Sequence, residues 1–279
     1  VAPPPPKPAS NRIRVDTLNP AEVQKVKQIG QGGFGVVFSA KFRGMTVAAK
    51  YLLETASPEL CAETEKEVNV MKLFDHPNIV FLVGACTAMP DVCIVTEFCA
   101  NGSLFDCMHK ARVNFSPASL WRIVRECAVG LNVLHQAQPT PVIHRDIKSL
   151  NILLDENWTV KICDFGLSKI MTKGSMMMTK GLGTPHWMAP EVISSSHYGT
   201  PSDVYSYGIL VWELYHRQIP YGNMDASQIV MKVVGNQMRP PINKRVPGSV
   251  ARLMQDCWAH DPARRPPFTA VIQMCDRMK

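Results

Sequence analysis

Three glycines in residues 29–37, IGQGGFGVV, form the first pattern that could support chemistry. Gly30, Gly32 and Gly35 fit G-x-G-x-x-G, and Val37 follows two residues later. Because glycine has no side chain to obstruct it, such a backbone can lie against phosphate oxygens. Dinucleotide-binding folds share this spacing, but there the glycines open a helix, whereas VVFSAKF here has the pattern of a strand. The pattern favours a phosphate-binding hairpin over a dinucleotide-dependent enzyme.

A lysine in apolar surroundings is the second pattern. Lys50 ends the run VAAK in a β-rich segment. A charge in such surroundings needs a partner, so we expect its ammonium to face an anion and a carboxylate. Glu67 on the following predicted helix is the candidate. Glu63 and Glu65 lie close to it, and composition does not choose among the three.

Residues 144–151, HRDIKSLN, hold the densest set of reactive groups. Imidazole, guanidinium, carboxylate, ammonium and carboxamide side chains occupy this segment, with only two aliphatic residues among them. The segment lies between apolar runs ending in TPVI and beginning with ILL. What polar groups do between two buried strands is a question that this segment alone leaves open.

Two kinds of periodicity predict the elements that position these groups. Short β-rich runs separated by glycine-bearing turns predict strands at 26–30, 36–42, 46–52, 81–86 and 92–97. Apolar residues at helical spacing predict helices at 58–74, 116–136, 203–216, 225–235, 249–260 and 268–278. Ser116 and Pro117 have the types expected at a helix start. The sequence therefore predicts a small strand-rich lobe, a larger helical lobe and a ligand site in the cleft between them.

The composition bounds the class of protein. The 279 residues, 46% hydrophobic and 19% charged, suit a globular protein with two lobes or one large domain. No run approaches the roughly 18 apolar residues of a membrane helix. The net charge of +7 is scattered along the chain, which argues against a nucleic-acid partner.

The nine cysteines form no C-x-x-C pair and predict free thiols in a reducing, cytoplasmic setting. The eight histidines lack zinc-site spacing. Residues 1–20 begin VAPPPPKP and predict an extended, flexible tail or linker. Because the first residue is Val1, we expect the chain to be a piece of a longer protein.

Taken in order, the motifs resemble those of the eukaryotic protein kinases, over roughly residues 24–279. The glycine loop and Lys50 are followed by HRDIKSLN, by DFG at 164–166, by APE at 189–191 and by SDVYSYG at 202–208. The resemblance implies the α+β, bilobal protein kinase fold, a domain of residues 21–279. Its N-lobe would be about 21–97, its hinge about 97–102 and its C-lobe about 103–279, with an ATP cleft between the lobes. Glu67, ten residues before Pro77, matches the helix glutamate of the family.

The resemblance also implies catalytic roles. Asp146 would orient the substrate hydroxyl and accept its proton, and Lys148 would neutralise charge on the γ-phosphate of ATP. Lys50 and Glu67 would complete the catalytic set. Asn151 and Asp164 would hold Mg²⁺ ions, with Mn²⁺ as a substitute.

Adenine binding would use backbone groups of the hinge, the carbonyl of Glu97 and the amide of Cys99. Thr96 resembles the gatekeeper behind the pocket. The adenine ring would be sandwiched by the side chains of Val37, Ala48 and Leu153. The residues predicted to contact ATP are Ile29, Gly30, Gly32, Gly33, Gly35, Val37, Ala48, Lys50, Thr96, Glu97, Cys99 and Leu153.

Two motifs bear on the acceptor. Lys148 favours serine or threonine, because tyrosine kinases carry Ala or Arg nearby, and Thr184 resembles a threonine that contacts the catalytic residues of Ser/Thr kinases. Trp187 and SDVYSYGILVWEL resemble tyrosine kinases instead. This mixture is typical of the tyrosine-kinase-like group, which includes Raf and mixed-lineage kinases. It implies a signalling Ser/Thr kinase with protein substrates, including downstream kinases; the alternatives are a dual-specificity kinase and a catalytically silent pseudokinase scaffold.

The segment LSKIMTKGSMMMTKGLGT, residues 167–184, resembles an activation loop. An upstream kinase would phosphorylate it, and Arg145 would pair with the phosphate. Thr179 is the principal candidate, and Ser175 and Thr172 are secondary ones. Behind this loop, Glu191 and Arg265 resemble a buried ion pair of the family, with Arg264 as the alternative partner.

Overall fold

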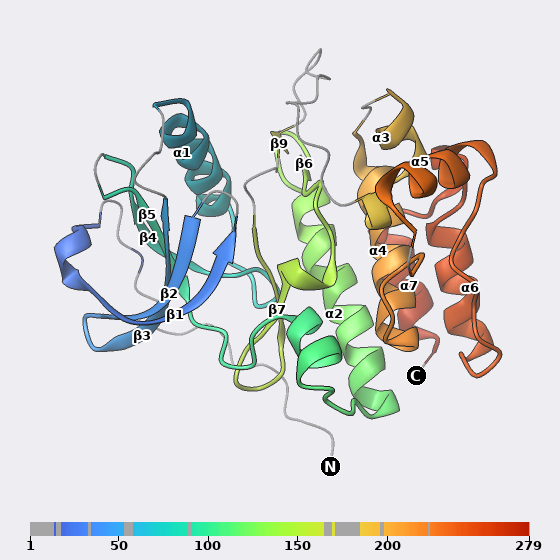
Figure 1. The fold of residues 1–279 in the computed structure, drawn as a ribbon, viewed down its shortest axis with the longest axis horizontal. Helices are drawn as coiled ribbons and strands as arrows, with labels where there is room; N and C mark the ends of the chain where they lie inside the picture. The colour runs from blue at the N-terminus through green and yellow to red at the C-terminus, as the bar shows by residue number, and fades with distance from the viewer. Residues whose placement is uncertain are drawn as a thin grey trace.

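Alternating apolar side chains build the first lobe around an antiparallel sheet of five strands, in the order β1-β2-β3-β5-β4 (Figure 1). The computed structural model describes residues 14, 18–32, 35–52, 58–88, 91–164, 169–170, 185–195, 198–222 and 224–278. The strands are β1 (Val23–Gly32), β2 (Gly35–Phe42), β3 (Met45–Leu52), β4 (Leu82–Cys86) and β5 (Cys93–Glu97).

The register of the sheet sets the positions of the predicted nucleotide-contacting residues. Val37 pairs with Lys50, and Ala48 pairs with Thr96 across the next strand. Gly35 lies where β2 passes close to β3, and a Cβ atom there would overlap the backbone carbonyl oxygen of Tyr51. Gly35 is therefore required by packing as well as by any phosphate.

Helix α1 (Pro58–Lys72) covers one face of the sheet (Figure 1). Its Val68 and Met71 are buried, and they join Leu82 and Ile94 in a core that continues into the second lobe. The other face of the sheet carries a separate apolar cluster that includes Phe42. Both faces are thus covered, which explains why β4 is buried at every residue.

Helices make up most of the second lobe. They are α2 (Pro117–His135), α3 (Pro190–Ser195), α4 (Thr200–His216), α5 (Ala226–Gly235), α6 (Gly248–Cys257) and α7 (Phe268–Asp276). The hydroxyl of Ser116 accepts a hydrogen bond from the N–H of Ser119, and Pro117 follows at the first helical position, as predicted. Helix α4 is buried from Ser202 to Leu214, since α2, α6 and short helical turns pack around it.

Four short strands lie beside the junction of the lobes. They are β6 (Val142–Ile143), β7 (Ile152–Leu154), β8 (Val160–Ile162) and β9 (Lys169–Ile170). β6 pairs with β9, and β7 pairs with β8. The segment HRDIKSLN therefore lies between two short strands, β6 and β7, as its flanking apolar runs predict.

The structure adds elements that the sequence patterns do not predict. These are β8, β9, α3, a π-helical turn (Asp106–Lys110) and four short 3-10 turns, Pro20–Glu22, Ser149–Asn151, Pro185–Trp187 and Pro262–Arg264. Each is too short to show a periodicity of its own. Among the described residues, no helix combines the length and the apolar character needed to cross a membrane.

Two residues of the predicted tail contact the first lobe. Leu18 is 3% exposed and belongs to the apolar cluster on the outer face of the sheet. Arg14 donates hydrogen bonds to backbone carbonyls of this lobe. These two positions are held by contacts with the first lobe. The flexible tail of residues 1–20 and its boundary with the domain at residue 21 stay predictions.

Candidate active site

Asp146 is the centre of the reactive segment. Lys148 Nζ lies 2.6 Å from its Oδ2, and Asn151 Nδ2 donates to the same oxygen at 2.9 Å. No described residue donates a hydrogen bond to Oδ1. Asn151 also bonds the backbone carbonyl of Asp146 at 2.7 Å. The carboxylate is thus fixed in orientation by one of its two oxygens.

A buried carboxylate on α4 holds the backbone of this segment. Asp203, 1% exposed, accepts hydrogen bonds from the N–H groups of His144 at 2.8 Å and Arg145 at 2.9 Å. His135 bonds the same carboxylate at 2.9 Å. Burial alone would raise the pKa of Asp203, but the hydrogen bond and charge of His135, with those of its neighbours, lower it below its ordinary value. Asp203 therefore stays ionised and able to hold the loop.

Two residues of the site have a left-handed backbone. The φ angles are 72° at Arg145 and 66° at Asp164. Such a conformation costs on the order of 1–3 kcal/mol for a residue other than glycine and persists only where neighbours enforce it. At Arg145 the bond from its N–H to Asp203 supplies that enforcement.

Lys50 joins the first lobe to the second. Its Nζ lies 3.5 Å from Oε2 of Glu67 on α1 and 3.8 Å from Oδ1 of Asp164. Burial opposes the charge on Lys50, but the two carboxylates outweigh it and raise its pKa above the ordinary value. Of the three candidate glutamates, Glu67 is buried and makes this contact, whereas Glu63 and Glu65 are exposed.

Cys163, the residue before Asp164, connects Asp164 to Asn151. The N–H of Cys163 donates to the carbonyl of Asn151 at 3.0 Å, which places Asp164 beside the Asp146 loop. Carboxylate and carboxamide oxygens are the donors that Mg²⁺ prefers, so these residues fit the predicted metal. Burial raises the pKa of the Cys163 thiol well above its usual range, so this thiol is neutral and unreactive.

The predicted adenine contacts lie on adjacent strands and on the connection between the lobes. Val37, Ala48 and Leu153 are half-buried, and Ile29 is exposed. The hydroxyl of Thr96 donates to the carbonyl of Glu97 at 3.3 Å. Burial raises the pKa of Cys99 to about 12, so its thiol is neutral.

A buried lysine holds the first residue of the connection. Lys161 on β8 is 3% exposed at its side chain, and its Nζ lies 3.1 Å from Oε2 of Glu97. The other oxygen of Glu97 accepts a hydrogen bond from the N–H of Phe81 at 2.8 Å. Glu97 is therefore tied to both lobes, and its backbone is fixed where the predicted adenine contact would form.

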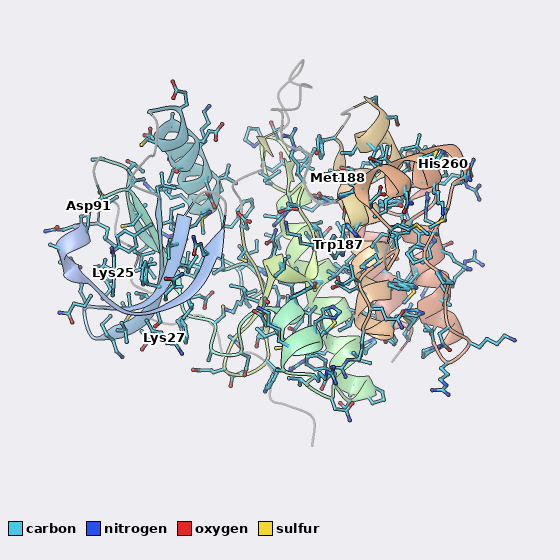
Figure 2. The ribbon with its side chains drawn as sticks, in the orientation of Figure 1. Lys25, Lys27, Asp91, Trp187, Met188 and His260 are labelled. Carbon is cyan, nitrogen blue, oxygen red and sulfur yellow. The ribbon has the colours of Figure 1, made fainter. Side chains whose placement is uncertain are left out.

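A second buried carboxylate on α4 joins three segments. Glu213 is fully buried, and Oε1 accepts from Ser149 at 2.6 Å and contacts His109 Nε2 at 3.0 Å. Oε2 accepts from the indole of Trp187 at 3.0 Å, and Ser206 donates to the Trp187 carbonyl at 2.7 Å. Trp187 lies beside α4 (Figure 2). Helix α4 thus fixes both the HRDIKSLN loop and the segment that precedes APE.

Replacing Glu213 by glutamine should destabilise the protein by about 1–3 kcal/mol, because Ser149 and Trp187 donate to its two different oxygens and an amide has only one acceptor oxygen. Its NH₂ group would face a donor, leaving one buried group unpaired. Equilibrium urea unfolding measures the change, with Glu156→Gln, an exposed site, as the matched control. A Glu213→Gln protein as stable as this control would contradict the network.

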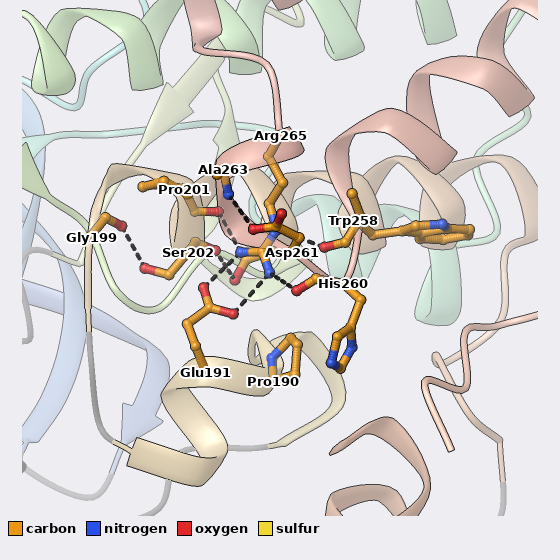
Figure 3. Close-up of polar contacts among 12 residues, drawn as sticks. Pro190, Glu191, Gly199, Pro201, Ser202, Trp258, His260, Asp261, Ala263 and Arg265 are labelled. Carbon is orange, nitrogen blue, oxygen red and sulfur yellow. Dashed lines mark hydrogen bonds and ion pairs between the residues drawn. The ribbon is translucent and has the colours of Figure 1, made fainter. Parts of the chain in front are cut away.

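The predicted ion pair behind the loop is present as Arg265 with Glu191. Nη1 and Nη2 of Arg265 lie 2.6 and 2.8 Å from the two carboxylate oxygens of Glu191 (Figure 3). The Arg265 side chain is 0% exposed. It also donates to the carbonyls of Pro201, Ala259 and His260. Arg265, not Arg264, is therefore the partner.

Several predicted residues lie outside the described part of the chain. They are Gly33 of the glycine loop, the phosphorylation candidates Thr172, Ser175 and Thr179, and Thr184. The other predicted site residues fall into two groups, one around Lys50 and the connection and one around Asp146.

Asp203, Glu213 and Lys161 are the site residues that the sequence analysis missed. A weak signal existed for Lys161 in VKIC and Glu213 in LVWELY, which are charged residues within apolar runs, whereas Asp203 follows the run GTPS. A buried charge requires a partner, so the first two positions indicated a buried polar contact without identifying it.

The chain matches known proteins over most of its length. The family described as protein tyrosine and serine/threonine kinase matches residues 23–275. Serine/threonine-protein kinase CTR1 of Arabidopsis thaliana is 39% identical over 251 residues, which are 89% of this chain and 30% of that protein.

Two further relatives have similar coverage. Serine/threonine-protein kinase STY17 of Arabidopsis thaliana is 38% identical over 253 residues, 90% of this chain and 44% of its own length. Probable serine/threonine-protein kinase drkB of Dictyostelium discoideum is 37% identical over 262 residues, 92% of this chain and 38% of its own length. The chain spans less than half the length of each of these relatives.

Proposed function

We propose a function for this chain from its family. The chain belongs to the protein tyrosine and serine/threonine kinase family and has its bilobal fold. Its proposed activity is to transfer the γ-phosphate of ATP to Ser and Thr hydroxyls of other proteins. One observation carries the proposal. Lys148 and Asn151 both hold Oδ2 of Asp146, on the second lobe, while Lys50 of the first lobe approaches Asp164. These contacts support a proposed site between the lobes in which Asp146 is the base, Lys148 the cation, and Asn151 and Asp164 the oxygen ligands.

The residues divide the chemistry of transfer among them. Asp146 Oδ1 would accept a hydrogen bond from the acceptor hydroxyl and take its proton as the hydroxyl oxygen bonds to the γ-phosphorus. The bond from that phosphorus to the β,γ-bridging oxygen would break at the same time, and ADP would leave. Lys148, 2.6 Å from the other oxygen, would stabilise negative charge on the transferring group. Lys50, held by Glu67, would orient the α- and β-phosphates. In-line positioning and charge stabilisation together account for most catalysis of this kind.

Asp164 and Asn151 would hold the metal. Their oxygens would hold Mg²⁺, or Mn²⁺ as a substitute with the same preference for oxygen, and the ion would supply positive charge beside the phosphates. The amide nitrogen of Asn151 is already bonded to Asp146, which directs its carboxamide oxygen away from that contact. The remaining ATP contacts would come from the glycine hairpin, from Thr96 and from the backbone of Glu97 and Cys99.

Serine and threonine are the proposed acceptors. Lys148 supports this, because its Nζ lies against the catalytic carboxylate in the place where tyrosine kinases differ. The relatives STY17 and CTR1 are also named as serine/threonine-protein kinases. Partners would be protein substrates, including downstream kinases, and an upstream activating kinase.

A cytoplasmic location is part of the proposal. All nine cysteines are free, including seven that are buried. Free thiols persist in a reducing compartment, which supports this location.

Activation is proposed to require phosphate on Thr179, with Ser175 and Thr172 as secondary sites. Arg145 supports the idea, because its Nε is buried and no described residue accepts a hydrogen bond from it. Its guanidinium lies 4.4 Å from the Tyr198 ring, and burial lowers its pKa. An added phosphate would give this cation a partner.

Thr179→Ala should lower the activity of protein pretreated with an activating kinase by about tenfold or more, because the proposed phosphate could not form. Phosphopeptide mapping of wild type and variant, alongside the rate, measures this. Unchanged activity with an unchanged phosphopeptide map would exclude Thr179.

A γ-phosphate transfer assay tests the proposed function. Purified protein is incubated with labelled ATP and a generic protein substrate, with magnesium, with manganese or with a chelator, and the phosphorylated amino acids are identified. Metal-dependent label on Ser or Thr is the expected result. Label on tyrosine as well would indicate dual specificity. Nucleotide binding without transfer, even after pretreatment with an activating kinase, would indicate a pseudokinase scaffold.

A further inference from the structure

Arg14 lies outside residues 23–275, where the family matches, yet its guanidinium is bonded into the first lobe. Nη1 donates to the carbonyl of Lys72 at 3.0 Å, Nη2 to that of Phe74 at 2.9 Å and Nε to that of Leu82 at 3.3 Å. One planar group therefore joins the carboxyl end of α1 to the first residue of β4.

The acceptors explain why arginine suits this place. The last carbonyls of a helix have no acceptor role inside the helix, and a cation there also interacts favourably with the helix dipole. The fixed fork of the guanidinium serves three carbonyls at once, which a lysine ammonium cannot match in geometry. The Arg14 guanidinium also lies 4.9 Å from the centroid of the Phe81 ring, which adds a cation–π contact.

A second contact anchors the same part of the chain. The N–H of Leu18 donates to the carbonyl of Ala85 on β4 at 3.0 Å. The Leu18 side chain is buried in the cluster that contains Phe81 and Val83. Arg14 is itself tied to β4 by its bond to the Leu82 carbonyl, separately from its bonds at the end of α1, so it can hold the helix against the sheet.

Helix α1 carries the carboxylate that Lys50 needs. Glu67 precedes Lys72 by five residues, about 7.5 Å along the helix axis. The contact from Glu67 Oε2 to Lys50 Nζ is 3.5 Å, so a small displacement of the helix would break it. Since a helix moves largely as one body, whatever fixes its carboxyl end also fixes Glu67.

We propose that Arg14 is a positioning residue for phosphoryl transfer: its three bonds hold α1 against β4 and thereby hold Glu67 at Lys50. This inference rests on the proposed kinase function. Arg14, which precedes the matched residues 23–275, would thus keep α1 in its active position.

The test compares Arg14→Ala, Arg14→Lys and Arg43→Ala with wild type. Arg43 is a matched control, since it is an exposed arginine of the same lobe, paired with Glu22. Each protein is assayed with Mg-ATP and a peptide acceptor, and backbone amide exchange is measured across α1. For Arg14→Ala we expect kcat to fall about tenfold and KM for the peptide to change less than about twofold. We also expect α1 amides to exchange faster, an intermediate Arg14→Lys protein and an unchanged Arg43→Ala protein.

Three results would overturn the inference. The first is an Arg14→Ala protein with the kcat of wild type, even if its α1 exchanges faster, since Arg14 would then only stabilise the lobe. The second is a fall in kcat without faster exchange in α1. The third is an equal loss in Arg43→Ala. The exchange measurement needs no turnover, so if wild type transfers no phosphate the proposed function fails, while faster α1 exchange in Arg14→Ala still supports the holding role.

Discussion

Replacing Asp146 by asparagine should lower kcat by about a thousandfold, within the range that a positioned general base contributes. The amide can neither take the proton of the acceptor hydroxyl nor pair with the charge of Lys148, 2.6 Å from Oδ2. The change is nearly isosteric, so the fold should persist. Initial rates of transfer from Mg-ATP to a peptide measure the loss.

Asp91→Asn is the control for this experiment. Asp91 is an exposed aspartate of the first lobe, remote from the Asp146 loop (Figure 2). Its replacement should leave the rate unchanged. If Asp146→Asn retained the wild-type rate, another group would have to accept the proton and the proposed mechanism would be wrong.

Arg265→Met should destabilise the protein by about 3–5 kcal/mol, the range for removing one partner of a buried ion pair. The variant leaves the Glu191 carboxylate and three backbone carbonyls without the donors that Figure 3 shows. Methionine fills part of the volume but donates no hydrogen bond. The midpoint and slope of equilibrium urea unfolding measure the loss.

Two comparison variants sharpen this prediction. Arg252, 74% exposed at its side chain, pairs with Asp256 one turn along α6, and Arg252→Met should cost less than about 1 kcal/mol. Arg265→Lys should lie between the two, because an ammonium cannot bond both oxygens of Glu191 in the same way. Equal losses in Arg265→Met and Arg252→Met would contradict a structural role for the buried pair.

The spacing of apolar residues along the sequence was enough to predict most helices and strands. It could not identify residues whose role depends on contacts with distant parts of the chain. The predicted helices at 58–74 and 203–216 correspond to α1 and α4, because the apolar residues of each recur at helical spacing. Glu67 could be named only through the family resemblance, since Glu63 and Glu65 are equally close in sequence. The structure separates them by burial.

The hydrogen bonds between distant residues that hold the site could not be predicted from the spacing of apolar residues. Glu213 meets Ser149 across 64 positions of sequence and His109 across 104. A single carboxylate in the apolar run GILVWELY shows that some donor must be found, but periodicity does not say which loop supplies it. Arg14 is a similar case, because a polar residue beside a proline-rich stretch has the composition of a linker and reveals its partners only in three dimensions.

The contacts of helix α4 bear on when, during refolding, the protein becomes able to transfer phosphate. Asp203, Ser206 and Glu213 hold, from one helix, the HRDIKSLN loop and the segment before APE. Segments of low intrinsic stability become ordered only against a unit that is already formed. During refolding, the reactive groups should therefore remain unordered until α4 is enclosed by its neighbours. Competence would then appear in a single late step governed by the centre of the second lobe, through residues that the proposed mechanism does not place in contact with ATP.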